Sequence, residues 1–153
     1  MNTTDFLQLQ AHVPDIKIIL ETKLRLLAYS EKHSLFYHEW HPDSDEMDEE
    51  IYKSETFILF EVLDEYRPTY MIVNDRKRKL KISPELKEFL VENTKTLQAL
   101  ASVKNVAIIN NELLSNQGQA ESTMDEVKDK SMPNGSQLRY FIDVNLAVRW
   151  LGI

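Results

Sequence analysis

The sequence predicts an α/β protein, with a mixed β-sheet of about five to six strands and helices packed on it. Two short and continuous apolar runs, Met71–Val73 and Val106–Ile109, are rich in β-branched residues, as parallel strands covered on both faces are. Between them, residues 83–101 carry leucines at helical spacing. A strand, a helix and a second strand in this order form a βαβ unit with parallel strands. We therefore expect these two runs at the centre of the sheet.

The first part of the chain predicts a loosely ordered leader and then an antiparallel meander. Residues 1–15 are polar with scattered apolar side chains. The apolar runs over 16–20 and 23–29 are separated by two residues, which predicts two sequential strands. The aromatic run Leu35–Trp40 follows a polar turn and predicts a third strand. We expect this strand or the first one to leave an exposed edge, through which two copies can form a homodimer.

Helices and one more strand complete the predicted order. Acidic residues near position 48 suit a helix N-terminus, and residues 47–66 carry apolar side chains three and four positions apart. Residues 110–127 predict a weaker helix that is interrupted near Gly118. A turn, a strand over 138–142 and a helix over 144–151, with Asp143 as its N-cap, follow. The predicted order is βββαβαβαβα.

The composition excludes several classes of function. The chain has 153 residues, a formal net charge of -7 and no cysteine, which rules out thiol nucleophiles, thiolate metal sites and disulfide scaffolds. The acidic balance argues against nucleic acid as a partner. No apolar run approaches the about 20 residues that span a bilayer, and the start has no signal-peptide pattern. We expect a cytoplasmic protein without membrane insertion, with one domain over 16–153 after the leader.

A compact basic segment follows the first of the two central strands. Arg76, Arg78, Lys79 and Lys81 lie at the predicted carboxyl end of this strand, where open α/β sheets commonly hold ligands. We predict these residues as a site for a partner protein or a small anion. A solvated loop that offsets the acidic residues near position 48 explains the same charges.

Ser83 begins the helix of the βαβ unit. As an N-cap followed by Pro84 its hydroxyl satisfies a free backbone N–H, which is a sufficient reason for a serine there. Phosphorylation is the alternative, because a phosphate at this place meets the positive end of the helix and the basic segment. Ser83 is therefore a candidate phosphorylation site.

No set of residues predicts an enzyme, a cofactor or a metal site. His38 and His41 are three positions apart and therefore point to opposite faces of a strand. The chain has 3 glycines and neither a Gly-rich phosphate loop nor a nucleophile elbow. An aromatic set at strand and helix spacing is typical of core, or it lines an apolar pocket for a lipid or nucleotide. Its members are Phe36, Tyr37, Trp40, Tyr52, Phe57, Phe60 and Tyr70.

The order of elements, the helix start Ile82–Leu86 and the closing pattern Arg139–Asp143, followed by Ala147 and Trp150, resemble the STAS-like superfamily. This is the fold of bacterial anti-sigma-factor antagonists, and the likeness covers residues 16–151, particularly to single-domain bacterial members. It implies a non-enzymatic regulatory module that binds a partner protein near the start of the helix at Ser83. In the antagonists a serine there is phosphorylated by the partner kinase. They have a short Asp-Ser-Ser-Gly type turn where this chain has the longer basic segment.

Overall fold

A six-stranded mixed sheet forms the centre of the computed structural model, which describes residues 4–42, 48–76, 83–85, 88–89, 98–110 and 135–153. The strands follow one another across the sheet in chain order: β1 (Lys17–Glu21), β2 (Arg25–Ser30), β3 (Leu35–Trp40), β4 (Tyr70–Asn74), β5 (Asn105–Ile109) and β6 (Gln137–Phe141). The first three strands are antiparallel, and β3 to β6 are parallel. The predicted α/β class with a mixed sheet is confirmed.

The two apolar runs that anchored the prediction lie side by side and point the same way. Met71 is paired with Val106 and Ile72 with Ala107 in the parallel ladder of β4 and β5. Ile72 and Ala107 are fully buried, as expected for parallel strands covered on both faces. The predicted helix between the strands is described only in part, since residues 84–85, 88–89 and 98–100 are helical. The predicted helix over 110–127 lies outside the described residues, apart from its first position.

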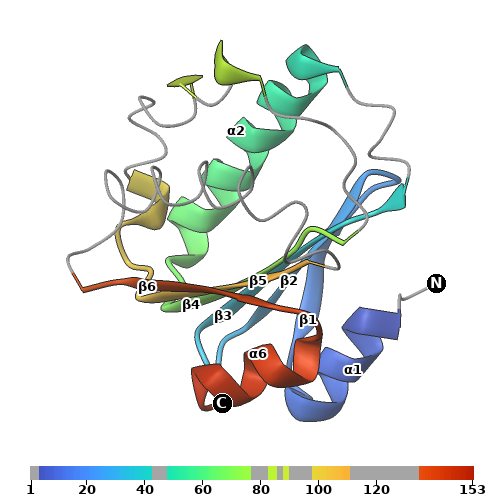
Figure 1. The fold of residues 1–153 in the computed structure, drawn as a ribbon, viewed down its shortest axis with the longest axis vertical. Coiled ribbons are helices and arrows are strands. Elements are labelled where there is room, and N and C mark those ends of the chain that lie inside the picture. Colours follow the sequence, from blue (N-terminus) through green and yellow to red (C-terminus); the bar gives the residue numbers. More distant parts are fainter. Residues whose placement is uncertain (1–3, 43–47, 77–82, 86–87, 90–97, 111–134) are drawn as a thin grey trace.

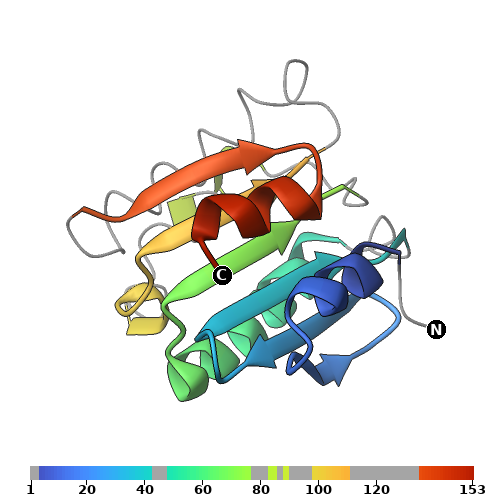
Figure 2. The same cartoon turned by 90° about the horizontal axis from the view of Figure 1, so that it is seen from below.

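Helices cover both faces of the sheet (Figures 1 and 2). Helix α2 (Glu49–Tyr66) lies on one face, and α1 (Thr4–His12) and α6 (Val144–Leu151) lie beside each other on the opposite face. Asp143 is the N-cap of α6, as predicted, and Asp48 has the same role in α2. Each aspartate accepts a hydrogen bond from a backbone N–H three residues later, which satisfies a donor that the helix leaves free.

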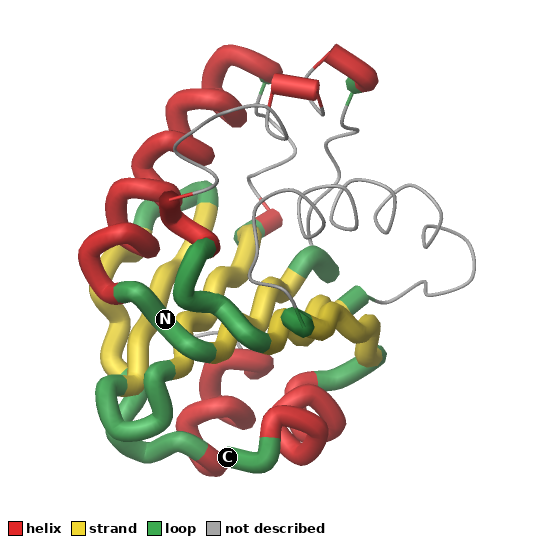
Figure 3. The backbone as a smooth tube through the Cα atoms, turned by 90° about the vertical axis from the view of Figure 1, so that its left-hand side faces the viewer, coloured by secondary structure: helices red, strands yellow, loops and turns green. Residues whose placement is uncertain are grey.

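Apolar side chains fill the layer between sheet and helices on each face. Figure 3 shows the helices on both sides of the strands. Phe6 and Leu9 of α1 and Val148 of α6 pack on one face of the sheet, together with Tyr37 and Ile72. The layer under α2 contains Leu27, Phe36, Phe60, Leu63, Met71, Ala99, Leu100, Val103, Val106 and Ile108. Burial of these side chains is the main stabilising contribution to the fold.

The N-terminal segment corrects the expectation of a loosely ordered leader over 1–15. Residues 4–12 form α1, and Phe6, Leu9 and Val13 are fully buried. These three residues are spaced by three and four positions, which places them on one face of a helix. The polar residues between them hide this short pattern in the sequence. The domain therefore includes α1 and does not begin at residue 16.

Of the two strands that were expected to leave an exposed edge, β1 does lie at the edge of the described sheet, whereas β3 does not. All six residues of β3 are buried, because the strand pairs with β2 on one side and with β4 on the other. The edges of the described sheet are β1 and β6. β1 has a β-bulge between Ile18 and Leu20 and a charged residue at each end, and both features discourage pairing with another strand.

Candidate functional site

Polar side chains gather at the carboxyl ends of the parallel strands. Glu39 lies near the end of β3, Asn74 is the last residue of β4, and Asn110 directly follows β5. Glu39 is paired with Asn74 in the register of β3 and β4, and all three residues are buried. Parallel strands bring such terminal residues to one edge of the sheet, which is where ligands bind in many α/β proteins. This edge is the candidate site.

Hydrogen bonds connect the two central strands of this edge to α1. The Tyr37 hydroxyl donates to Glu39 Oε1 at 2.5 Å. The Asn74 side-chain amide donates to the Tyr37 hydroxyl oxygen at 3.0 Å and to Asp5 Oδ2 at 2.8 Å. Since Asp5 belongs to α1, the network fixes the amino end of this helix on the sheet. We call Asp5, Tyr37, Glu39 and Asn74 the edge network.

Arg76, the first residue of the predicted basic site, extends the edge network to the segment before α6. Its backbone N–H donates to Asn74 Oδ1 at 3.2 Å, and its guanidinium Nη1 donates to Asp5 Oδ1 at 3.3 Å. Nη2 donates to the carbonyl oxygen of Ile142. The Arg76 side chain therefore joins α1 to the segment before α6, and its backbone N–H bonds to the last residue of β4.

Electrostatics keep the Tyr37 hydroxyl in its donor form. Burial raises the pKa of Tyr37 far above its ordinary value, and the nearby Glu39 carboxylate raises this pKa further. A histidine flanks the other oxygen of Glu39, since His41 Nδ1 lies 3.8 Å from Glu39 Oε2. The same ring reaches Glu21 Oε2 of β1 with Nε2, at 3.1 Å. Polar contacts thus run from α1 across the edge to the outer strand β1.

The members of the edge network are buried and hold chain segments in place. Tyr37 is fully buried and Glu39 is 1% exposed. The groups of the network already bond to one another. Within the described ranges, no three His, Asp or Glu side chains converge so that they could hold a metal ion. The contacts of the edge network thus hold α1 against the ends of β3 and β4.

A second polar cluster lies on the opposite face, under α2. The side chain of Arg25 is fully buried, and its Nη2 donates to Glu55 Oε2 at 2.9 Å and to the Glu55 carbonyl oxygen at 2.6 Å. The guanidinium carbon lies 5.6 Å from the centre of the Trp40 ring. Burial lowers the pKa of Arg25, and the Glu55 carboxylate opposes this. Its Nε and Nη1 make no hydrogen bond, so Glu55 carries the charge compensation.

The structure describes two of the predicted site residues. Arg76 forms hydrogen bonds to Asn74 and Asp5 of the edge network. Ser83 is half-buried and directly precedes two helical residues, Pro84 and Glu85. Arg78, Lys79 and Lys81 lie outside the described residues. Of the four members of the edge network, only Tyr37 was singled out from the sequence, as part of the aromatic set, whereas Asp5, Glu39 and Asn74 were not. The available signal was a polar residue at the end of an apolar strand, as in Asn74 after Met-Ile-Val.

Comparisons with known proteins found no match: no family model, no curated protein and no solved structure is similar to the chain. The STAS-like superfamily therefore stays a prediction from the sequence pattern. In the part of the chain that the structure describes, no helix has the length and apolar character required to cross a membrane.

Proposed function

We propose that the chain is a non-enzymatic, cytoplasmic regulatory module that binds a partner protein at the carboxyl edge of its sheet, near Arg76 and Ser83. The proposal rests on exposed apolar side chains of α1 and of the segment before and within α6, which Arg76 connects. Leu7 of α1 and Ile142 before α6 are each 51% exposed, and Leu146 of α6 is 39% exposed. Apolar residues exposed together on one region are typical of surfaces that bind other proteins.

Arg76 links the segments that carry these exposed apolar side chains. Its guanidinium bonds to Asp5, two residues before Leu7, and to the carbonyl oxygen of Ile142. A further bond between His12 and Asn145, at 2.7 Å, joins α1 and α6. A surface that is already ordered loses little conformational entropy on binding. The basic residues that follow Arg76 in the sequence favour a partner with acidic and apolar side chains.

The packing favours this proposal over a carrier with a ligand between sheet and helices. Phe36 and Phe60, two members of the aromatic set, pack in the apolar layer under α2. Trp40 and Tyr52 are also buried and stack at 5.9 Å between ring centres. These aromatic side chains contribute to the core, so we propose that they do not line a binding pocket.

Affinity capture followed by calorimetry with the purified partner tests the proposal. Ile142→Glu combined with Leu146→Glu should weaken binding at least about tenfold, because it places charge in an apolar contact. The matched control is Ile51→Glu with Ile58→Glu on α2, where both side chains are 43% exposed and the net charge changes equally. Substitutions at exposed positions should change stability by only about 0.5 kcal/mol. Equal affinity of the two double variants would contradict the proposal.

A further inference from the structure

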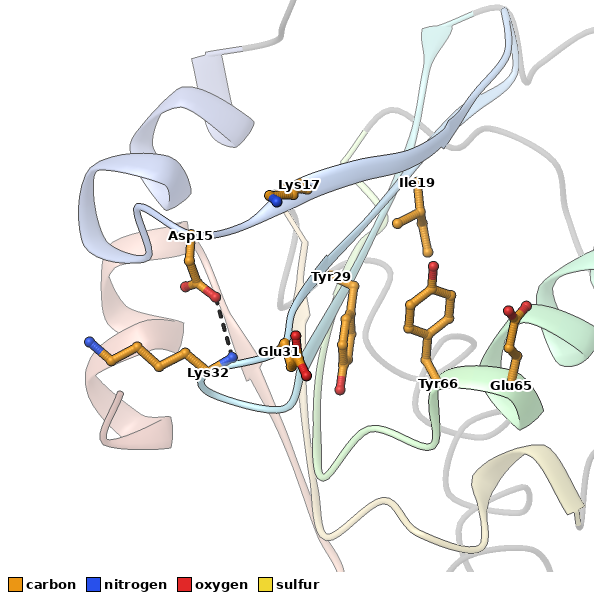
Figure 4. A pocket seen from close by; sticks show the side chains of 8 residues that line it. All are labelled: Asp15, Lys17, Ile19, Tyr29, Glu31, Lys32, Glu65 and Tyr66. Carbon is orange, nitrogen blue, oxygen red and sulfur yellow. Dashed lines mark hydrogen bonds between the residues drawn. The ribbon is translucent and has the colours of Figure 1, made fainter.

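An open hollow lies at the other end of the sheet from the edge network. It has a volume of about 800 Å³ and is formed by the segment before β1, by β1 and β2, by the turn after β2 and by the end of α2. Its lining residues are Asp15, Lys17, Ile19, Tyr29, Glu31, Lys32, Glu65 and Tyr66 (Figure 4). Tyr66 ends α2 shortly before β4 begins, so the hollow lies at the amino ends of the parallel strands.

Two tyrosines from different elements form the apolar part of this hollow. The ring centres of Tyr29 in β2 and Tyr66 in α2 are 4.7 Å apart, with 51° between the ring planes. Both side chains are only partly buried, so aromatic surface faces the hollow. The β-bulge of β1 places Ile19 beside the ring of Tyr66, as Figure 4 shows. Exposed tyrosine rings attract cations, because the face of an aromatic ring carries partial negative charge.

Carboxylates lie on both sides of the tyrosine pair. Figure 4 shows Glu31 beside Tyr29 and Glu65 beside Tyr66. Neither carboxylate has an ion pair or hydrogen bond within the described residues, and the last turn of α2 has no basic residue. Asp64, the neighbour of Glu65, is paired with Arg67 at 2.9 Å. Glu65 therefore adds its charge to the partial negative charge of the helix C-terminus, which a bound cation would offset.

Three further charged residues line the hollow, Asp15, Lys17 and Lys32. The Asp15 carboxylate accepts hydrogen bonds from the Ser30 hydroxyl at 2.8 Å and from the Lys32 backbone N–H at 3.3 Å. The Lys32 side chain extends away from the tyrosine pair (Figure 4). Lys17 lies opposite Tyr29 in the register of β1 and β2, and among the described residues it forms no ion pair with Glu31 or Glu65.

We propose that the hollow binds an organic cation, an ammonium or guanidinium group that sits on the Tyr29 and Tyr66 rings between Glu31 and Glu65. The same chemistry has two sources, a free small cation or the side chain of lysine or arginine in a peptide. The site is separate from the partner surface around Arg76, so it does not depend on the proposed function.

Titration of the full-length protein followed by NMR tests this inference. The probes are tetramethylammonium, N-acetyl-arginine amide and a five-residue peptide with a central arginine. We expect saturable shifts of the Tyr29 and Tyr66 signals with the cations and none with acetate. A peptide that binds at least about tenfold more tightly than the arginine amide assigns the site to a peptide side chain, and equal affinity assigns it to a free cation.

Charge-matched variants decide whether the binding is specific. Glu31→Gln with Glu65→Gln should weaken binding of the probes about tenfold or more, because both flanking carboxylates become neutral. Glu49→Gln with Glu50→Gln, at the other end of α2, makes the same change in net charge and should leave the affinity unchanged. Equal weakening in the two double variants, or no saturable shift with any cation, would overturn the proposal.

Discussion

Neutralising Glu55 should destabilise the protein strongly, because Arg25 would then be a buried charge without compensation. The Arg25 side chain is fully buried and the Glu55 side chain is 14% exposed, with 2.9 Å between Nη2 and Oε2. Two unit charges about 4 Å apart interact by about 4 kcal/mol at an effective dielectric constant near 20. Removal of one partner from a buried pair typically costs about 3–5 kcal/mol. We expect Glu55→Gln to lower the free energy of unfolding by this amount.

Replacement of Arg25, the other member of the pair, should destabilise the protein less than replacement of Glu55. Arg25→Met removes the buried charge and keeps an apolar side chain of similar length under Trp40, while Glu55 remains near solvent. Replacement of a whole buried pair by apolar or neutral groups is often neutral or stabilising. Adding Arg25→Met to Glu55→Gln should therefore restore about 2 kcal/mol or more of the lost stability. If the two substitutions acted independently, their effects on stability would add, and the second would not rescue the first.

Urea unfolding measures both effects, with circular dichroism for the helices and fluorescence for the two tryptophans, Trp40 and Trp150. For a chain of this length, 3–5 kcal/mol corresponds to a fall of about 6–20 °C in melting temperature. The control is Glu50→Gln, whose ion pair with Lys53 is 3.8 Å long and solvent-exposed. Glu50→Gln should lower the free energy of unfolding by less than about 1 kcal/mol. If Glu55→Gln costs no more than this control, or if the double variant is less stable than Glu55→Gln, the reasoning is refuted.

Three more predictions follow from the structure. The pKa of Tyr37 is raised in the folded state, so the stabilising contribution of Tyr37 is complete below about pH 10 and is lost as the pH rises further. The free energy of unfolding, measured with urea, should therefore fall more steeply above pH 10 in wild type than in Tyr37→Phe. Burial raises the pKa of Asp15, but hydrogen bonds from Ser30 and Lys32 outweigh burial, so this pKa lies below its ordinary value of 3.8. As the pH falls below 3.8, the free energy of unfolding should therefore decrease more in wild type than in Asp15→Asn. Leu9→Ala should lower the free energy of unfolding by about 2–5 kcal/mol, since Leu9 of α1 is fully buried. Leu7 is 51% exposed, so Leu7→Ala should change this free energy by no more than about 0.5 kcal/mol.

The sequence was most informative where one type of pattern dominated. The β-branched runs around Ile72 and Ala107 predicted two parallel strands, because a strand buried on both faces shows no alternation of polar and apolar residues. The closing helix was predicted with its N-cap Asp143, since an aspartate before an apolar helical stretch has a direct physical role. Local chemistry determines such features, so they can be recognised without knowledge of the rest of the fold.

Features that depend on distant parts of the chain were not predicted. Arg25 stands between two leucines in its strand, and no neighbouring residue indicates that it pairs with Glu55 of α2. Asp5 belongs to a segment that was expected to be loosely ordered, and its hydrogen-bond partner Asn74 lies 69 positions away. No local pattern encodes such pairs, because each residue alone is compatible with the surface. The same limit applies to the hollow, whose two tyrosines are brought together by the sheet and α2.

The order of the strands also indicates what kind of ligand suits the carboxyl edge. β3, β4 and β5 follow one another without a reversal, so right-handed crossovers place the described parts of the two connections between them on the same face. α2 and the residues Ala99 and Leu100 of the next connection do share the same apolar layer. The other face is left to α1 and α6, the helices at the two ends of the described chain. Deep ligand crevices in open α/β sheets form where the strand order reverses. The described strands show no such reversal, and this order agrees better with the proposed binding of a partner protein near Arg76 than with the alternative of a small-ligand carrier.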